Sequence, residues 1–190
     1  MLNFVTEIYG FTSNADPKAS YLKARAGLIA KSKRAKEIIE KVEASTHVID
    51  VVIGSSVGTE SAFRGAMEGE GSSKLVWDDS VSFPILVDSK QVTTTKKFMG
   101  KDLTTEKTVA KLSPLPAEIV LIHELGHACQ YLGDLATYKT LFASGGIATI
   151  EADNLEKTEW PVCDDYGMMR RSNYMHYKGS SDTSKWGIIE

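Results

Sequence analysis

The chain has 190 residues, of which 42% are hydrophobic and 25% charged, and its formal net charge is −3. A chain of this length and mixture can bury one hydrophobic core, so we expect a single domain over residues 1–190. The slight acidic excess, 25 acidic against 22 basic residues, provides no field that would attract nucleic acid or an anionic membrane. The composition therefore argues against both as partners.

Neither the start of the chain nor its hydropathy indicates export or membrane insertion. Residues 1–10 lack the basic start and apolar core of a signal peptide, and no run of 18 apolar residues occurs. The two cysteines, Cys129 and Cys163, are too few for a disulfide framework. We expect a protein of the producing cell's cytoplasm, or one secreted by a dedicated route.

The first predicted element is helical. Apolar residues recur at helical spacing over residues 21–44, after helix-start residues at 14–17, which predicts one long helix or two helices split near Ser32. The β-branched run 47–53 predicts a strand, which the glycines of residues 54–58 should end.

Two further strands are predicted in the middle of the chain. Glycine and serine dominate residues 65–73, which predicts a loop, and residues 74–78 and 83–88 then have the composition of strands. Residues 93–98 fit either a strand or a loop. One of the two strands is a candidate for an exposed edge to which an extended peptide could add.

The second half of the chain predicts two helices and a polar tail. Pro114 and Pro116 stand where a helix from Ala117 to about Leu132 should begin, because proline is tolerated in the first turn of a helix. Gly133 should end that helix. A second helix is expected over residues 149–158.

The first of these helices contains the segment His-Glu-Leu-Gly-His. Side chains four apart on a helix lie about 40° apart around its axis, so His123 and His127 can bind one metal ion. Glu124 is turned about 100° from His123, which lets its carboxylate reach a metal-activated water without binding the metal itself. The small Gly126 suggests that another element, or the substrate, approaches the helix closely.

A catalytic zinc needs a third protein ligand and one open position. A glutamate from a following helix is a common third ligand, and the sequence offers Glu151, Glu156 and Glu159. Because residues eight apart on an unbroken helix differ by about 80°, Glu151 and Glu159 should not point in the same direction. The residues alone leave this choice open.

The segment from Pro114 to Tyr174 resembles the bacterial effector zinc metalloproteases of the NleD type and their predicted relatives in toxins and fungi. In that group the downstream block reads Thr-Glu-Asn, then glycine eight residues after the glutamate, then Arg-x-x-Tyr. This chain has Trp160 where asparagine is usual. The residues that carry the resemblance are 123–128, 150–154, Thr158, Glu159, Gly167, Arg171 and Tyr174.

The resemblance implies Glu159 as the third zinc ligand, with Glu151 as the second choice. A guanidinium or a phenol aimed at the oxyanion of peptide hydrolysis would supplement the zinc, which gives Arg171 and Tyr174 a catalytic role. The alternative is that Arg171 pairs with a carboxylate and that Tyr174 packs with its hydroxyl exposed.

Together these features predict an α+β, zincin-like domain: a small β-sheet packed on the helix that carries the metal motif, with a second helix that carries glutamates. We expect a zinc metallopeptidase, an effector or toxin protease, in which Zn²⁺ lies on His123, His127 and Glu159, Glu124 is the general base, and the substrate is a protein or peptide. Two alternatives stay open. One is a binding module whose structural zinc is closed by His176 or Cys163, and the other is a zinc amidase acting on a non-peptide bond.

Overall fold

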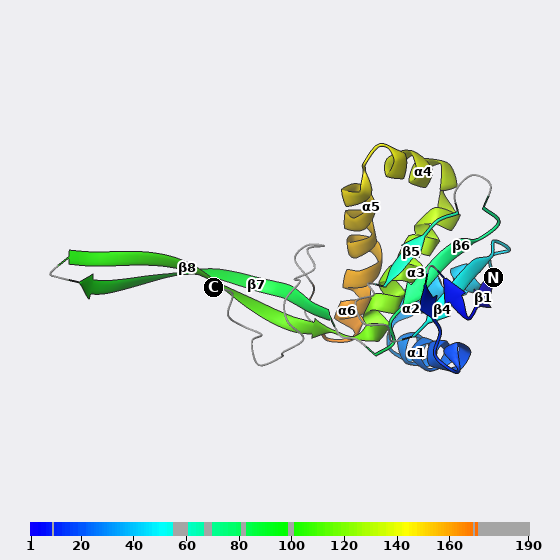
Figure 1. Cartoon of the computed structure of the whole chain (residues 1–190), viewed down its shortest axis with the longest axis horizontal. Helices are drawn as coiled ribbons and strands as arrows, with labels where there is room; N and C mark the ends of the chain where they lie inside the picture. Colours follow the sequence, from blue (N-terminus) through cyan, green and yellow to red (C-terminus); the bar gives the residue numbers. More distant parts are fainter. Residues whose placement is uncertain are drawn as a thin grey trace.

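The computed structural model describes residues 1–8, 10–54, 61–66, 70–80, 83–98, 101–168 and 170. Within them the chain folds into a mixed α+β body from which a long hairpin projects (Figure 1). The predicted small sheet packed against helices is confirmed at this level. Residues 171–190, which include the expected polar tail, lie outside the described residues.

The main sheet has four strands in the order β1-β4-β6-β5. The first three run parallel, and β5 pairs antiparallel with β6 at the edge of the sheet. Strands β4 and β6 match the strands predicted at 47–53 and 74–78, whereas β1 and β5 were not predicted because three residues are too few for a visible alternation. Their bounds are β1 Leu2–Phe4, β4 Ile49–Ile53, β5 Ala62–Arg64 and β6 Ser73–Trp77; a separate antiparallel pair joins β2 Glu7–Ile8 to β3 Phe11–Thr12.

Helices α1 (Pro17–Lys31) and α2 (Lys33–Glu43) decide between the two alternatives that the sequence left open, in favour of two helices split at Ser32. Asp16 caps the first helix by accepting a hydrogen bond from the Ala19 N–H, and the Ser32 hydroxyl caps the second. The same Ser32 hydroxyl donates to Asp165 at 2.6 Å, which ties the break between the two helices to the distant end of the chain.

The hydrophobic core lies between these helices, the sheet and α3 (Ala117–Gly133). Leu28 of α1, Ile39 of α2 and Leu125 of α3 are fully buried in it. The Trp77 indole N–H donates to the Ala117 carbonyl at 2.8 Å, so the end of β6 fixes the start of α3. This packing holds α3 along its length, and the metal motif lies on that helix.

A long two-stranded hairpin replaces the short strand expected at 83–88. Strands β7 (Phe83–Phe98) and β8 (Lys101–Leu115) pair from Phe83 opposite Leu115 to Phe98 opposite Lys101, with one irregularity at Leu86/Asp88. Residues 93–98 are therefore strand. Pro114 lies in β8 instead of the helix entry, and Pro116 precedes the first helical residue.

A nearly continuous helical rod follows α3 and the short α4 (Leu135–Ala143). It consists of α5 (Ile147–Asn154), the π-helical segment η1 (Leu155–Glu159) and α6 (Trp160–Asp165). The predicted helix at 149–158 is thus part of a longer rod, which stands beside α3 (Figure 1). Helix α4 was not predicted, although Leu135, Tyr138 and Phe142 recur along it at helical spacing; none of its side chains is fully buried.

The two strands named as candidate edges differ. Strand β6 is an inner strand between β4 and β5 and offers no free edge, whereas β7 belongs to a two-stranded sheet with β8 and is paired on one side only. The edge of the main sheet beside α3 is β5. Among the described residues, no helix is both long and apolar enough to cross a membrane.

Candidate metal centre

Helix α3 places its two motif histidines side by side. The Nε2 atoms of His123 and His127 lie 3.1 Å apart, and both side chains are buried. Leu121, Leu125 and Ala128 of the same helix face the core. The helix therefore has one face in the core and one face that presents two imidazoles, as the sequence predicts.

Glu151 of α5 completes a cluster of three potential ligands. Its carboxylate oxygens lie 3.1 and 3.2 Å from Nε2 of His127, and Oε2 lies 3.3 Å from Nε2 of His123. A tetrahedral zinc ion with bonds of about 2.0–2.1 Å requires neighbouring ligand atoms to be about 3.3 Å apart. The buried side chains of His123, His127 and Glu151 can thus hold a metal ion.

The other nitrogen of each imidazole faces a hydrogen-bond acceptor. His123 Nδ1 lies 3.0 Å from the Glu159 carboxylate, and His127 Nδ1 lies 3.0 Å from the side-chain oxygen of Gln130. In the tautomer with the proton on Nδ1, each neutral imidazole donates to these acceptors and turns its Nε2 lone pair toward the cluster. Both Nε2 lone pairs then face each other and the Glu151 carboxylate, which is unfavourable unless a cation or a proton lies between them.

The π-helical segment explains why both glutamates reach one histidine. A π segment adds one residue to the helix, so the eight residues from Glu151 to Glu159 rotate by about 700°, as seven would in an α-helix. The two side chains then differ by about 20° instead of the 80° of an unbroken helix. The two carboxylates lie on opposite sides of the His123 ring, one at each nitrogen.

The structure therefore separates the three glutamates that the sequence left as alternatives. Glu151 contacts both Nε2 atoms, whereas Glu159, the ligand that the resemblance favours, is fully buried against Nδ1 of His123 and does not belong to the three-residue cluster. Glu156 is exposed on the rod. The metal cluster of the described residues contains Glu151 in the place expected for Glu159.

The close approach expected at Gly126 is made by the rod. A Cβ atom on Gly126 would lie 2.0 Å from the side-chain oxygen of Asn154 and 2.7 Å from a methyl carbon of Thr158. The Asn154 amide donates to the His123 carbonyl at 2.9 Å, and Gln130 donates to the Ile150 carbonyl at 3.0 Å. The absence of a side chain at Gly126 thus lets the two helices pack closely enough to share the metal site.

Glu124 lies beside the cluster without joining it. Burial raises the pKa of its carboxyl, while the nearby His123 and His127 and a hydrogen bond from the Phe63 backbone act in the opposite direction. Burial also raises the pKa of Glu151, but its contacts with the imidazoles of His123 and His127 lower it to about 2. Glu151 is thus held as an anion, whereas Glu124 retains an appreciable proton affinity, as a general base requires.

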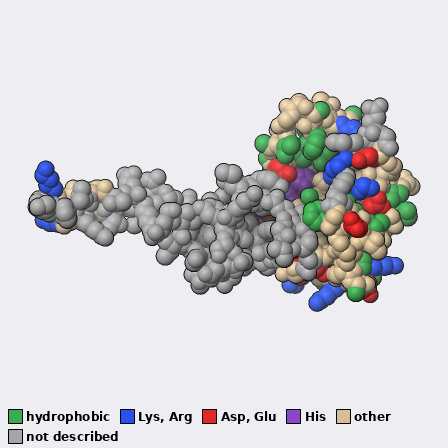
Figure 2. Space-filling model, in the orientation of Figure 1, with side chains coloured by type: hydrophobic (Ala, Val, Ile, Leu, Met, Phe, Trp, Pro, Cys, Tyr) green, Lys and Arg blue, Asp and Glu red, His purple; other side chains and the backbone are tan. Residues whose placement is uncertain are grey.

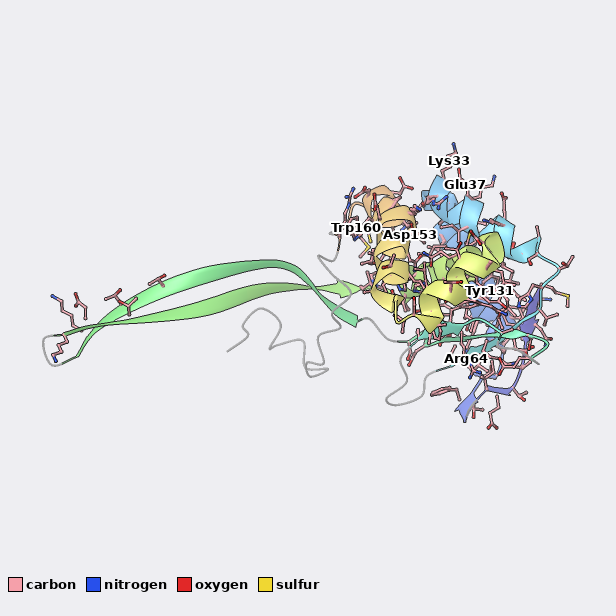
Figure 3. The ribbon with its side chains drawn as sticks, turned by 90° about the horizontal axis from the view of Figure 1, so that it is seen from above. Lys33, Glu37, Arg64, Tyr131, Asp153 and Trp160 are labelled. Carbon is pink, nitrogen blue, oxygen red and sulfur yellow. The ribbon has the colours of Figure 1, made fainter. Side chains whose placement is uncertain are left out.

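The cluster is buried and has a small exposed fraction: the Glu151 side chain is 11% exposed and those of His123 and His127 are 4% and 6% exposed. Figure 2 shows histidine side chains next to acidic side chains, with hydrophobic side chains gathered beside them. Figure 3 shows the body from above, with Asp153 and Trp160 on the rod. Gln130 also donates to Asp153 at 2.8 Å, so its amide links α3 to the rod twice.

Of the other residues named in the sequence analysis, three lie outside the described residues and one lies in the core. Arg171, Tyr174 and His176 lie outside the described residues. Cys163 is buried in the hydrophobic core and is not part of the cluster. The sequence analysis missed the hydrogen-bonding roles of Asn154 and Gln130. Their positions, three residues after Glu151 and after His127, were the available signal, because residues three apart share a helix face.

No family model matches the chain, and comparison with the curated proteins and with the solved structures finds no match either.

Proposed function

We propose that the protein is a zinc-dependent metallopeptidase with a zincin-like active site, related to the NleD-type effector proteases, in which His123, His127 and Glu151 hold the metal. The observation that carries this proposal is the convergence of two Nε2 atoms and one carboxylate while both Nδ1 atoms are engaged on the other side. Three protein ligands among the described residues suit a catalytic zinc, which keeps one position open.

Glu159 then has a supporting role instead of the ligand role that the resemblance implies. Its carboxylate accepts a hydrogen bond from the Nδ1–H of His123, which fixes the tautomer and the ring orientation. The same bond makes Nε2 a stronger electron-pair donor to the metal. Gln130 does the same for His127 with a neutral acceptor. The two ligands are thereby aimed at one point before any metal binds.

When bound, the zinc ion would act as a Lewis acid that polarises the scissile carbonyl and acidifies a water molecule. Glu124 takes a proton from the attacking water and transfers it to the leaving amine. Its raised pKa suits both transfers, because the carboxyl has to accept the proton and hold it until the amine departs. Arg171 and Tyr174 remain proposals as oxyanion-stabilising groups.

A peptide is favoured over a non-peptide amide by the position of β5. This edge strand lies against α3, and the N–H of its central residue, Phe63, donates to Glu124. A peptide that added to this edge as a further strand would pass beside the general base. The strand thus supplies the backbone recognition that a protein or peptide substrate needs.

The test is hydrolysis of a mixture of diverse peptides by the zinc-loaded protein, followed by mass spectrometry. Wild type should cleave the peptides and lose this activity with a chelator. Glu124→Gln should bind zinc normally but have a kcat lower by about a thousandfold, within the range expected for the loss of a general acid–base group. Glu118→Gln, a change at an exposed glutamate of the same helix, should retain full activity. Turnover by Glu124→Gln at the wild-type rate would refute the mechanism.

A further inference from the structure

A cavity of about 250 Å³ lies between the end of β5 and helices α3 and α4. Its walls are largely aromatic: Tyr131 of α3, Tyr138 and Phe142 of α4, and the backbone at Gly65 and Ala66. Tyr131 and Arg64, which also lines the cavity, lie on the same side of the body in Figure 3. The metal ligands do not line this space, so the cavity is separate from the metal cluster.

One wall of the cavity is fixed by close packing between β5 and α3. A Cβ atom on Gly65 would lie 2.5 Å from two ring carbons of Tyr131, so the ring lies directly on the backbone there. The Tyr131 hydroxyl donates to the Ala66 carbonyl at 3.3 Å, and its ring meets that of Phe63 edge-on. This wall is therefore already formed in the free protein.

The opposite wall is more exposed. The rings of Tyr138 and Phe142 are stacked with centroids 6.4 Å apart, and Tyr138 also meets Tyr131 edge-on at 5.5 Å. Phe142 is 47% exposed, although a ring of this size is usually buried. An exposed ring at the mouth of an aromatic cavity leaves apolar surface that a ligand can cover.

The cavity is next to the chemical groups of the site. The Phe63 N–H donates to Glu124, and the next three residues of the chain, 64–66, line the cavity. Burial, with the Glu151 and Glu124 carboxylates, raises the pKa of Tyr138 to about 12, so this side chain lies within the field of both acids. A peptide seated along β5 beside Glu124 would therefore pass the mouth of the cavity.

We propose that this cavity is a specificity subsite that receives one large apolar side chain, aromatic or long aliphatic, of the peptide substrate; the inference rests on the proposed peptidase function. An apolar cavity of about 150 Å³ suffices to bind benzene, so 250 Å³ holds one aromatic side chain. Lys139 and Arg64 at its lining disfavour a basic side chain. Aromatic walls favour an apolar side chain, and the cavity adjoins β5, the strand to which the peptide would add.

The first experiment compares peptides that differ at a single position. The position that enters the cavity should prefer Phe, Tyr or Leu over Ala and Lys, and Phe142→Ala should reduce kcat/KM for the Phe peptide at least about tenfold relative to the Ala peptide. Leu135→Ala, at an equally exposed apolar residue of α4 that does not line the cavity, should leave this ratio unchanged. A Phe/Ala ratio that Phe142→Ala does not change would overturn the subsite while leaving the peptidase function intact.

The second experiment does not depend on activity. N-acetyl-phenylalanine amide is titrated into the protein and followed by NMR of its labelled aromatic rings. The signals of Tyr138 and Phe142 should shift in wild type and in Leu135→Ala, and the Tyr138 shift should be lost in Phe142→Ala. Binding here without any peptide cleavage would support the cavity and refute the peptidase, whereas unchanged signals at both rings would overturn the subsite.

Discussion

Two carboxylates on one helical rod face the same imidazole from opposite sides, and they differ in what surrounds them. The Glu151 side chain is 11% exposed and contacts the Nε2 atoms of two histidines, whereas the Glu159 side chain is completely buried and contacts Nδ1 of one histidine. Two glutamates of the same rod therefore have different surroundings, because each contacts a different nitrogen of the His123 ring.

In the proposed metal site, this difference would divide the work between a carboxylate that binds the metal and one that orients a ligand. A ligand carboxylate has to leave an open position for water and substrate, so it lies where the site reaches the surface. A carboxylate that only orients a ligand can be buried, because its partner is a fixed N–H group. The π-helical segment between Glu151 and Glu159 allows one rod to supply both.

The largest expected effect is the contrast between these two glutamates in zinc affinity. Glu151→Gln removes a ligand charge and should weaken zinc binding more than a hundredfold, while Glu159→Gln, which keeps an acceptor oxygen but removes its charge, should weaken it about 10- to 100-fold, the usual effect of changing an outer hydrogen-bond partner. Competition against a fluorescent chelator measures both constants. Glu156→Gln, at an exposed glutamate of the same rod, is the matched control and should bind zinc like wild type.

The ranking of those two variants decides which glutamate is the ligand. A greater loss in Glu159→Gln than in Glu151→Gln would reverse the assignment and restore the ligand that the resemblance implies. Circular dichroism and thermal unfolding of the metal-free variants separate this result from a loss of folding, because Glu159 is fully buried.

The next prediction concerns the close contact between α3 and the rod at Gly126. Gly126→Ala would place a methyl group 2.0 Å from Asn154, and such overpacking costs about 1–3 kcal/mol of unfolding free energy. Separation of the two helices should also weaken zinc binding. Gly27→Ala, in the interior of α1 with no atom within 4 Å of the new methyl group, should instead stabilise the protein by about 1 kcal/mol.

Both glycine variants are compared by urea unfolding with and without zinc. If Gly126→Ala were as stable as Gly27→Ala, the packing of α3 against Asn154 and Thr158 would not hold the site together.

The sequence predicts the metal helix well because its signals are local. The four-residue spacing of His123 and His127 fixes their geometry on any helix, and the split at Ser32 is also decided by neighbouring residues. The end of the helix was predicted to within one residue, since Gly133 is its last residue and Asp134 caps it. The position of the proposed third ligand depends on a π-helical segment, which changes the rotation of the rod by about one residue and leaves no pattern in the sequence. Spacing alone therefore predicts that Glu151 and Glu159 diverge, and the structure shows that they do not.

The missed elements have a similar physical reason. Strand β5 has three residues, and its place at the edge beside Glu124 is set by pairing with β6, which lies about ten residues away. Helix α4 has Leu135, Tyr138 and Phe142 at helical spacing, but its nine residues are few for a recognisable helical pattern. Both the proposed peptide-binding edge and the aromatic cavity are built from these elements.

A smaller effect is expected on the other histidine. Gln130 gives His127 Nδ1 a neutral acceptor where His123 has a charged one, so Gln130→Leu should weaken zinc binding less than Glu159→Gln, by about tenfold. Gln130→Glu keeps an acceptor at the same place and should restore much of the affinity. If Gln130→Glu bound zinc as weakly as Gln130→Leu, the role of Gln130 would lie in its bonds to the rod instead.

The smallest effect is expected at a carboxylate that stabilises the scaffold without any metal. Glu43 of α2 accepts hydrogen bonds from Arg25 at 2.7 and 2.9 Å and from the Tyr21 hydroxyl at 2.9 Å. Burial raises the pKa of Glu43, but the hydrogen bonds from Arg25 and Tyr21 outweigh it, so the pKa is lowered in the folded protein. Protons therefore bind the unfolded chain more readily, and the stabilisation is lost as the pH falls.

We expect Glu43→Gln to be less stable than wild type by about 1 kcal/mol or less at pH 7, since the pair of Glu43 and Arg25 is partly exposed. The deficit should be complete above about pH 4.5 and should shrink as the pH falls below that value toward the lowered pKa. Urea unfolding from pH 3 to 7 in the presence of a chelator measures it, with Glu37→Gln, at an exposed ion pair of the same helix, as control. A loss of stability that does not depend on pH would mean that Glu43 acts through packing. A pH-dependent loss that zinc does not alter would show that the Glu43 carboxylate stabilises the fold alone, in contrast to the role proposed for Glu151.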